Sequence, residues 1–203
     1  MTEGVLLYTR FERLWHWSQA VFVIALLLTG FELHVSLALL GFAPALALHQ
    51  GTALVLVGLW AFAWFWHVIT GEWRQYRPAP LPRLRAMLRY YLYDIFLGRP
   101  HPFRRDRTRK LNPLQRLAYL ALHLAISPAL WLSGLALLGY GAWNHWDRGF
   151  PALAVVAQTH LLGAYAMLAF LIVHLYLALS TSATPFADLR AMVTGREPPP
   201  EEE

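Results

Sequence analysis

The sequence predicts an all-α fold, a four-helix transmembrane bundle, from its hydrophobic content, the length of its apolar blocks and the placement of its basic residues. Of 203 residues, 57% are hydrophobic and only 14% are charged, whereas a soluble domain carries about 25% charged residues. The apolar residues form four blocks, each long enough for the roughly 20 helical residues that cross a bilayer. The expected spans are residues 12–36, 46–70, 115–140 and 152–180.

The basic residues predict the orientation of these spans. Of 17 Lys and Arg residues, twelve lie from Arg74 to Arg116, two (Arg10 and Arg13) lie at the start of the first span and two follow the last. Only Arg148 lies on the other side. The positive-inside rule therefore places both termini and the 71–114 loop in the cytoplasm. The net charge of +5 reflects this asymmetry, so we expect membrane lipid and no nucleic acid among the partners.

The elements follow in order along one domain, residues 1–196. The first block is too long for the core of a signal peptide and is expected to be a retained helix. Residues 84–97 mix arginines with large apolar side chains at helical spacing. They predict a short helix in the cytoplasmic interface, with an amphipathic helix packed on a partner as the alternative. No internal repeat is evident, and the acidic tail 197–203 is expected to be disordered.

The absence of cysteine limits the chemistry. The chain has no Cys residue, which excludes iron–sulfur clusters, disulfides, thiolate zinc sites and covalently attached c-type haem. Any haem in this chain must be held by axial ligands and packing alone.

The histidines inside the spans are the candidate functional residues, because ionisable side chains in a membrane are costly and usually functional. His160 and His174 lie in a stretch, residues 151–181, that contains no charged residue. They are fourteen residues apart, which in an α-helix is a rise of about 21 Å along the axis. The rotation about the axis over these residues is about 40° short of four full turns. Both therefore lie on nearly the same face, one near each membrane surface. Two cofactor sites fit this arrangement, whereas one metal ion cannot bridge both.

The depth of each histidine in the membrane narrows the choice of a second ligand for His160 and for His174 but leaves two candidates for each. His16 lies level with His174, and His49 lies level with His160, but His67 and His34 reach the same two depths. Eighteen residues separate His16 from His34 and His49 from His67, which is five full turns, so each of these pairs also shares a face.

Other residues remain open at this point. His123 is a further candidate in the third span. For His34, His67 and His145 we favour an interfacial histidine without a ligand role. Small residues at Gly51 and Gly163 would let a flat macrocycle approach, although glycine also favours close helix packing.

Several motifs occur in a specific order along nearly the whole chain. They are RFERLWHW and LLLTGFEL in the first span, His49 at the start of the second, LNPLQRLAY before the third, the His160/His174 pair, and the closing TPFADLRAMVTG. In this order they resemble the dihaem cytochrome b subunits that anchor membrane hydrogenases, formate dehydrogenases and thiosulfate reductases. TGEWRQYRP and the closing stretch make the chain most similar to the thiosulfate-reductase-type branch.

The resemblance implies two haem b groups and a quinone, menaquinone or ubiquinone, near the cytoplasmic-side haem. Asn112 and Gln115 are the candidate quinone contacts, although Asn112 before Pro113 also predicts a helix N-cap. Arg10 and Arg13 are candidate partners of haem propionates, although topology alone explains them. The implied axial ligands are His16, His49, His160 and His174, paired as His16 with His174 and His49 with His160.

The resemblance also implies a location and partners. We expect a multi-pass protein of the bacterial cytoplasmic (inner) membrane, in a respiratory chain. Its partner would be a periplasmic oxidoreductase with iron–sulfur, molybdenum or nickel–iron centres. The chain has no catalytic motif of its own, so electron transfer is the leading hypothesis. The alternatives are a self-contained cytochrome b that couples quinone to a small diffusible species such as superoxide, and a metal or proton transporter, which a bundle without broken helices argues against.

Overall fold

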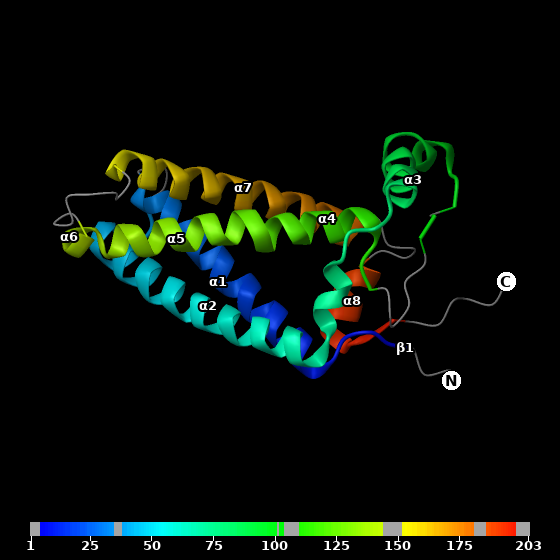
Figure 1. The fold of residues 1–203 in the computed structure, drawn as a ribbon, viewed down its shortest axis with the longest axis horizontal. Coiled ribbons are helices and arrows are strands. Elements are labelled where there is room, and N and C mark those ends of the chain that lie inside the picture. Colours follow the sequence, from blue (N-terminus) through cyan, green and yellow to red (C-terminus); the bar gives the residue numbers. More distant parts are fainter. Residues whose placement is uncertain are drawn as a thin grey trace.

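The chain forms a helical bundle with a cap of short elements at one end (Figure 1). The cap contains both ends of the described chain and the short helices of the 71–112 loop. We call this the basic end, because the arginine-rich loop lies there, and we call the opposite end the far end. The computed structural model describes residues 5–34, 38–100, 102–103, 110–143, 152–180 and 186–197.

Within the described residues, four helices are long and apolar enough to cross a membrane, which confirms the predicted fold class and marks the chain as an integral membrane protein. The first and second spans are single helices, whereas the third is built from three helical segments in direct succession. The spans are α1 (Arg10–Leu33), α2 (Phe42–Thr70), α4 (Pro113–Ala121) with η3 (Leu122–Ile126) and α5 (Ser127–Leu138), and α7 (Leu153–Ser180).

Local sequence signals set where the spans begin and end at the basic end. Thr9 and Glu12 form a capping box at the start of α1, which satisfies backbone donors that the helix leaves open. Asn112 and Gln115 form the same motif before Pro113 at the start of α4. The second span stops at Gly71, which adopts a left-handed φ of 77° and is suited to ending a helix because it has no Cβ.

The third span contains a π-helical turn. Pro128 lies two residues after the end of this turn, as the second residue of α5, and a proline ring cannot fit a regular α-helical ladder because it lacks an N–H and contacts the preceding turn. The wider π turn accommodates it without breaking the span. The third span is therefore continuous but is not a regular α-helix throughout.

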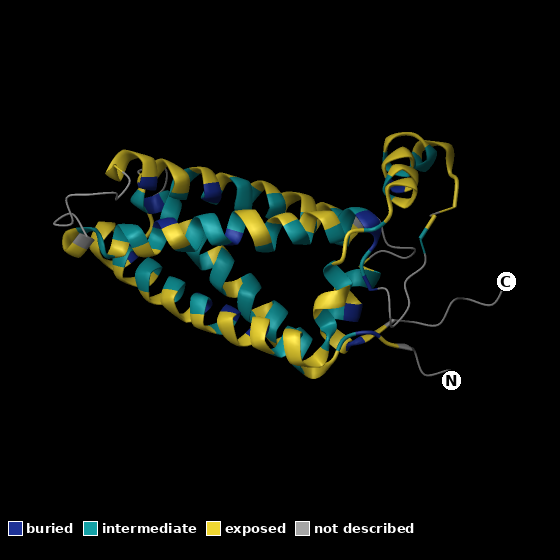
Figure 2. Ribbon diagram, in the orientation of Figure 1, coloured by how far each residue is buried: buried dark blue, intermediate teal, exposed yellow. Residues whose placement is uncertain are grey.

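The spans pair into two helical hairpins. The first helix packs along α2, and α5 packs along α7. The two hairpins meet where α1 contacts α7 and where Trp60 of α2 packs against Trp131 of α5. Apolar side chains on the outward faces are open: Leu132 and Leu162 are 69% and 68% exposed. Figure 2 shows exposed and half-buried residues along the full length of the spans. Such large apolar surfaces are typical of a protein surrounded by lipid.

Short elements build the cap at the basic end. The predicted helix over residues 84–97 is confirmed as α3 and η2, while its place in the membrane interface stays a prediction. Arg13 of α1 donates a hydrogen bond to the carbonyl of Val193 in the last helix, so the cap ties the C-terminal segment to the first span. The elements are η1 (Glu72–Tyr76), α3 (Leu81–Leu92), η2 (Asp94–Leu97), α8 (Ala187–Thr194) and the antiparallel strands β1 (Val5–Leu6) and β2 (Arg196–Glu197).

Two predictions fall at the edges of the described segments. Glu197 belongs to β2, and the rest of the predicted tail, residues 198–203, lies outside the described residues, as does His145. One further short helix, α6 (Tyr140–Trp143), follows α5 at the far end.

Candidate cofactor site

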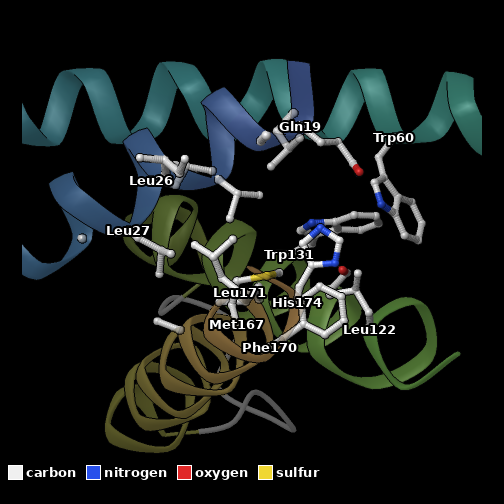
Figure 3. Close-up of a pocket in the computed structure, with 18 of the residues that line it drawn as sticks. Gln19, Leu26, Leu27, Trp60, Leu122, Trp131, Met167, Phe170, Leu171 and His174 are labelled. Carbon is white, nitrogen blue, oxygen red and sulfur yellow. The ribbon is translucent and has the colours of Figure 1, made fainter. Parts of the chain in front are cut away.

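A cavity of about 1070 Å³ lies between the two hairpins and is lined by all four spans. Pockets for single small molecules and cofactors are about 300–1,000 Å³, so this cavity lies just above the upper end of that range. Figure 3 shows part of its wall, with Leu26 and Leu27 from α1, Trp60 from α2 and Met167 from α7. Its mostly apolar lining contains His34 and the four histidines that the resemblance implies as axial ligands: His16, His49, His160 and His174.

These four histidines form two facing pairs. The ring centroids of His16 and His174 are 6.1 Å apart, and those of His49 and His160 are 6.2 Å apart. Two metal–nitrogen bonds of about 2 Å, plus about 1 Å from each nitrogen to its ring centre, span about 6 Å. Each pair is therefore spaced to hold one metal atom between two imidazoles. The described residues contain no group of three His, Cys, Asp or Glu that could hold a bare ion.

At the far end, the hydroxyl of Thr29 orients His49. The Thr29 hydroxyl donates its single hydrogen to the carbonyl of Ala25 at 2.7 Å. Because that hydrogen is used, the hydroxyl accepts from Nδ1–H of His49 at 2.9 Å. A neutral imidazole protonated on Nδ1 has a free lone pair on Nε2, which is the state that binds a metal.

His160 is oriented in the same way by the third span. Its Nδ1 lies 3.1 Å from the carbonyl of Leu130 and 3.1 Å from the hydroxyl of Ser133, which itself donates to the carbonyl of Ala129. A backbone carbonyl can only accept, so Nδ1 carries the hydrogen and Nε2 is free. Both far-end histidines thus present the same nitrogen for metal binding.

A glycine follows each of the two hydroxyl residues and makes room for the imidazole edge. A Cβ at Gly30 would lie 3.3 Å from Cε1 of His49, and one at Gly134 would lie 3.1 Å from Cε1 of His160. The two glycines predicted to let a macrocycle approach, Gly51 and Gly163, do not lie against a histidine. A Cβ at Gly163 would lie 3.0 Å from the side chain of Leu130, in line with the helix-packing alternative, and a Cβ at Gly51 would meet nothing within 4 Å.

The basic-end pair is held more loosely. Nδ1 of His174 lies 3.3 Å from the hydroxyl of Tyr119, and its ring is stacked on Phe170 with an interplanar angle of 4° (Figure 3). Nδ1 of His16 is buried and has no hydrogen-bond partner among the described residues. The two pairs therefore differ in the hydrogen bonds behind their ligating nitrogens.

The other described histidines, His34, His67 and His123, are not paired across the cavity. His67 uses both nitrogens elsewhere: Nδ1 donates to the carbonyl of Ala63 at 2.7 Å, and Nε2 lies 3.1 Å from the hydroxyl of Tyr76. His34 lines the cavity at the exposed end of α1, and no ring contact joins it to His160 within the described residues. His123 contacts the ring of Trp60, and its Nδ1 has no partner among the described residues.

The candidate quinone contacts sit at the start of α4. The N-cap predicted for Asn112 is confirmed. The side-chain oxygen of Asn112 accepts a hydrogen bond from the backbone N–H of Gln115 at 2.8 Å, and the side-chain oxygen of Gln115 accepts one from the backbone N–H of Asn112 at 2.9 Å. Gln115 lines the cavity, whereas Asn112 is buried outside the lining. A contact of either residue with quinone stays a prediction.

The candidate propionate partners lie away from the cavity lining. Arg13 bonds the carbonyl of Val193, and Arg10 is exposed at the start of α1. Neither lines the cavity, but Lys110 does. Sequence reasoning missed Lys110, and it also missed the hydroxyl–glycine pairs Thr29–Gly30 and Ser133–Gly134, whose recurrence in two apolar spans was the available signal.

A four-helix transmembrane bundle with facing histidine pairs around an apolar cavity, in a chain without cysteine, has the features of a membrane b-type cytochrome. The chain belongs to the prokaryotic cytochrome b561 family, whose family model matches residues 7–195. This family consists of membrane electron-transfer proteins that bind b haem, typically two groups. The residues of this cavity fit such a group: the paired imidazoles suit axial ligation, and the apolar wall suits a macrocycle held without a covalent bond.

One curated relative covers nearly the whole chain. The chain is 32% identical over 198 residues to the protein named "Putative cytochrome YdhU" of Escherichia coli (strain K12), a match that covers 95% of this chain and 74% of that protein. No solved structure is significantly similar to the chain.

Proposed function

We propose that the chain is a dihaem subunit that passes electrons across the membrane between a partner oxidoreductase at the far end and quinone at the basic end. The observation that carries the proposal is the placement of His160 and His174 on one helix, each facing a histidine of the other hairpin. Their axial separation of about 21 Å covers most of the roughly 30 Å hydrocarbon core. The basic end would face the cytoplasm of a bacterial inner membrane.

The residues divide into two binding sites. His49 and His160 would hold one haem, and His16 and His174 the other. A bound haem supplies a centre that accepts and releases one electron at a time. The chain's own contribution is to fix the imidazoles through Thr29 and Ser133, and to keep water out with apolar side chains.

The proposed partners lie at opposite ends of the bundle. The resemblance to anchor subunits supports a periplasmic partner with iron–sulfur, molybdenum or nickel–iron centres as the electron donor or acceptor. The position of Gln115 in the cavity wall supports quinone exchange at the basic end, because a side-chain amide can donate a hydrogen bond to a quinone carbonyl.

The test is the haem content of the purified chain. We expect two haem b groups per chain from a pyridine haemochrome assay, and reduction of both by a soluble quinol. One haem per chain would contradict the two-site arrangement. No haem in folded protein would contradict the proposal entirely. Steady turnover of quinone with superoxide by the isolated chain would instead support a self-contained enzyme.

The hydroxyls behind the far-end histidines make a second prediction. Hydrogen bonding from Nδ1–H makes an imidazole a stronger donor to the metal, which favours the oxidised state. Thr29→Val and Ser133→Ala should therefore raise the midpoint potential of the far-end haem. If the lost hydrogen bond stabilised the oxidised state by about 1 kcal/mol, the midpoint potential of this one-electron couple should rise by about 40 mV.

A potentiometric titration of the haem absorbance measures this shift. Ser127→Ala is the matched control, because Ser127 is equally buried on α5 but bonds no histidine in the described structure. An equal shift in the control, or an equal shift in both haems, would contradict the assignment.

A further inference from the structure

A buried group of three charged side chains connects the basic end to the cavity. Nζ of Lys110 lies 2.6 Å from Oε1 of Glu12 and 3.3 Å from Oε2 of Glu72. The Lys110 side chain is 7% exposed and lines the cavity, whereas the Glu72 side chain is 29% exposed. We call Glu12, Lys110 and Glu72 the ionic triad. It reaches from the surface of the cap to the cavity wall.

The fold positions the ionic triad firmly. The second carboxylate oxygen of Glu12 accepts from the backbone N–H of Thr9 at 2.7 Å as part of the capping box of α1. The backbone N–H of Lys110 donates to the side chain of Gln75 at 3.3 Å, and Glu72 begins η1. Three segments far apart in sequence therefore fix its geometry.

The ionic triad carries two carboxylates and one ammonium, so it has a net negative charge inside an otherwise basic end. A buried ion pair is weak evidence for stability, because removing charges from water offsets much of their attraction. A negative, partly exposed group at a cavity wall also attracts protons from water. This combination suits proton transfer better than it suits structural support.

A second polar pair lies behind the ionic triad. The hydroxyl of Tyr76 lies 3.1 Å from Nε2 of His67, whose Nδ1 donates to a backbone carbonyl. Burial, with Tyr119, Glu12 and Glu72 nearby, raises the pKa of Tyr76 above its usual value. Tyr76 is therefore a protonated phenol that donates to Nε2 of His67.

The Tyr76–His67 pair is surrounded by polar side chains of the third span and by the ionic triad. The ring of Tyr76 contacts those of Tyr119 and His123 in the third span. His67 interacts electrostatically with all three members of the ionic triad. The Tyr76–His67 pair therefore lies close enough to the ionic triad to respond to a change in its charge.

We propose that the ionic triad, with the Tyr76–His67 pair behind it, is a proton-transfer site between water at the basic end and a quinone in the cavity. This inference rests on the proposed function. Reduction of a quinone to a quinol consumes two electrons, delivered through the haems from the reduced partner, and two protons. For each proton, the ammonium of Lys110 protonates a quinone oxygen, and water reprotonates the lysine through Glu72. Quinol oxidation runs the same steps in reverse.

The experiment uses the full haem-loaded chain in lipid nanodiscs. Haem reduction is followed by stopped-flow absorbance with menadiol, a soluble quinol that must release protons, and with dithionite, which need not. Loss of a positioned proton-transfer group costs about 10²-fold or more in rate. We expect Lys110→Met to slow haem reduction by menadiol by about 10²-fold and to leave the rate of haem reduction by dithionite unchanged.

Lys110→Arg separates proton transfer from charge. Arginine keeps the positive charge and the ion pairs but cannot give up its proton. We expect Lys110→Arg to be as slow with menadiol as Lys110→Met, while its haem content equals that of the wild type. Recovery of the wild-type rate in Lys110→Arg would overturn the proposal, because a structural role survives with the charge alone.

Glu72→Gln provides an independent variant at a more exposed position, in case changes at Lys110 prevent folding. We expect slower haem reduction by menadiol for Glu72→Gln, and no change for Asp94→Asn, a carboxylate of the same cap that pairs with Arg99. A wild-type rate of haem reduction by menadiol in Glu72→Gln would contradict the proton-transfer site but not the proposed quinone function. If menadiol fails to reduce wild-type haems that dithionite does reduce, the quinone function fails, and the inference fails with it.

Discussion

His174→Ala is expected to remove the basic-end haem and to leave the far-end haem in place. The imidazole of His174 faces His16 at a centroid distance of 6.1 Å. The other pair lies about 21 Å away along α7, and its hydrogen bonds come from Thr29 and Ser133. The pyridine haemochrome assay should fall from two haems per chain to one, and reduction by quinol should be lost.

His34→Ala is the matched control for this experiment. His34 lines the same cavity but has no facing histidine among the described residues, so its replacement should keep both haems. Equal loss of both haems from His174→Ala would show that the two sites are not independent. Loss of a haem from His34→Ala would show that the ligand pairing is wrong.

Gly134→Leu is expected to remove the far-end haem. A Cβ at this position already lies 3.1 Å from Cε1 of His160, so a leucine must push the imidazole away from His49. Changes behind a metal ligand typically cost about 10–100-fold in metal affinity, and displacing the ligand itself should cost at least as much. Haem content and the reduced-minus-oxidised spectrum measure the loss.

Gly51→Leu is the corresponding control, because a Cβ at Gly51 meets nothing within 4 Å and the residue is exposed. It should retain two haems. Gly134→Ala should lie between the wild type and Gly134→Leu, since a methyl group needs only a small shift of the ring. Two intact haems in Gly134→Leu would contradict the view that this glycine makes room for His160.

The fold was predictable because its strongest signals are local. Apolar blocks of bilayer length gave all four spans, and the mixed pattern over residues 84–97 gave the helix that the structure shows as α3 and η2. Helical periodicity also placed His160 and His174 on one face. Periodicity gives the depth and the face of a residue, but it cannot say which side chain stands across a cavity. His16 and His67 were therefore equal candidates by depth.

The structure places these two histidines in different contacts, and those contacts have no local pattern in the sequence. Nε2 of His67 lies at the hydroxyl of Tyr76, and Tyr76 is placed by a short 3₁₀ turn after α2 that the spacing of apolar residues does not predict. Thr29 and His49 lie on different helices of one hairpin, so their hydrogen bond depends on how α1 and α2 pack. Lys110 precedes the LNPLQ motif in a basic stretch, and its burial between two carboxylates required three distant segments to meet.

The arrangement of the hairpins has a consequence for how the protein is made in the cell. Each hairpin is packed within itself, and the histidine pairs reach from one hairpin to the other: α1 to α7 at the basic end and α2 to α7 at the far end. A group bound by both members of a pair holds the hairpins together, and any ligand that binds only the assembled state stabilises it by mass action. Haem supply would then regulate abundance after translation, because chains that fail to acquire it would remain open to membrane proteases.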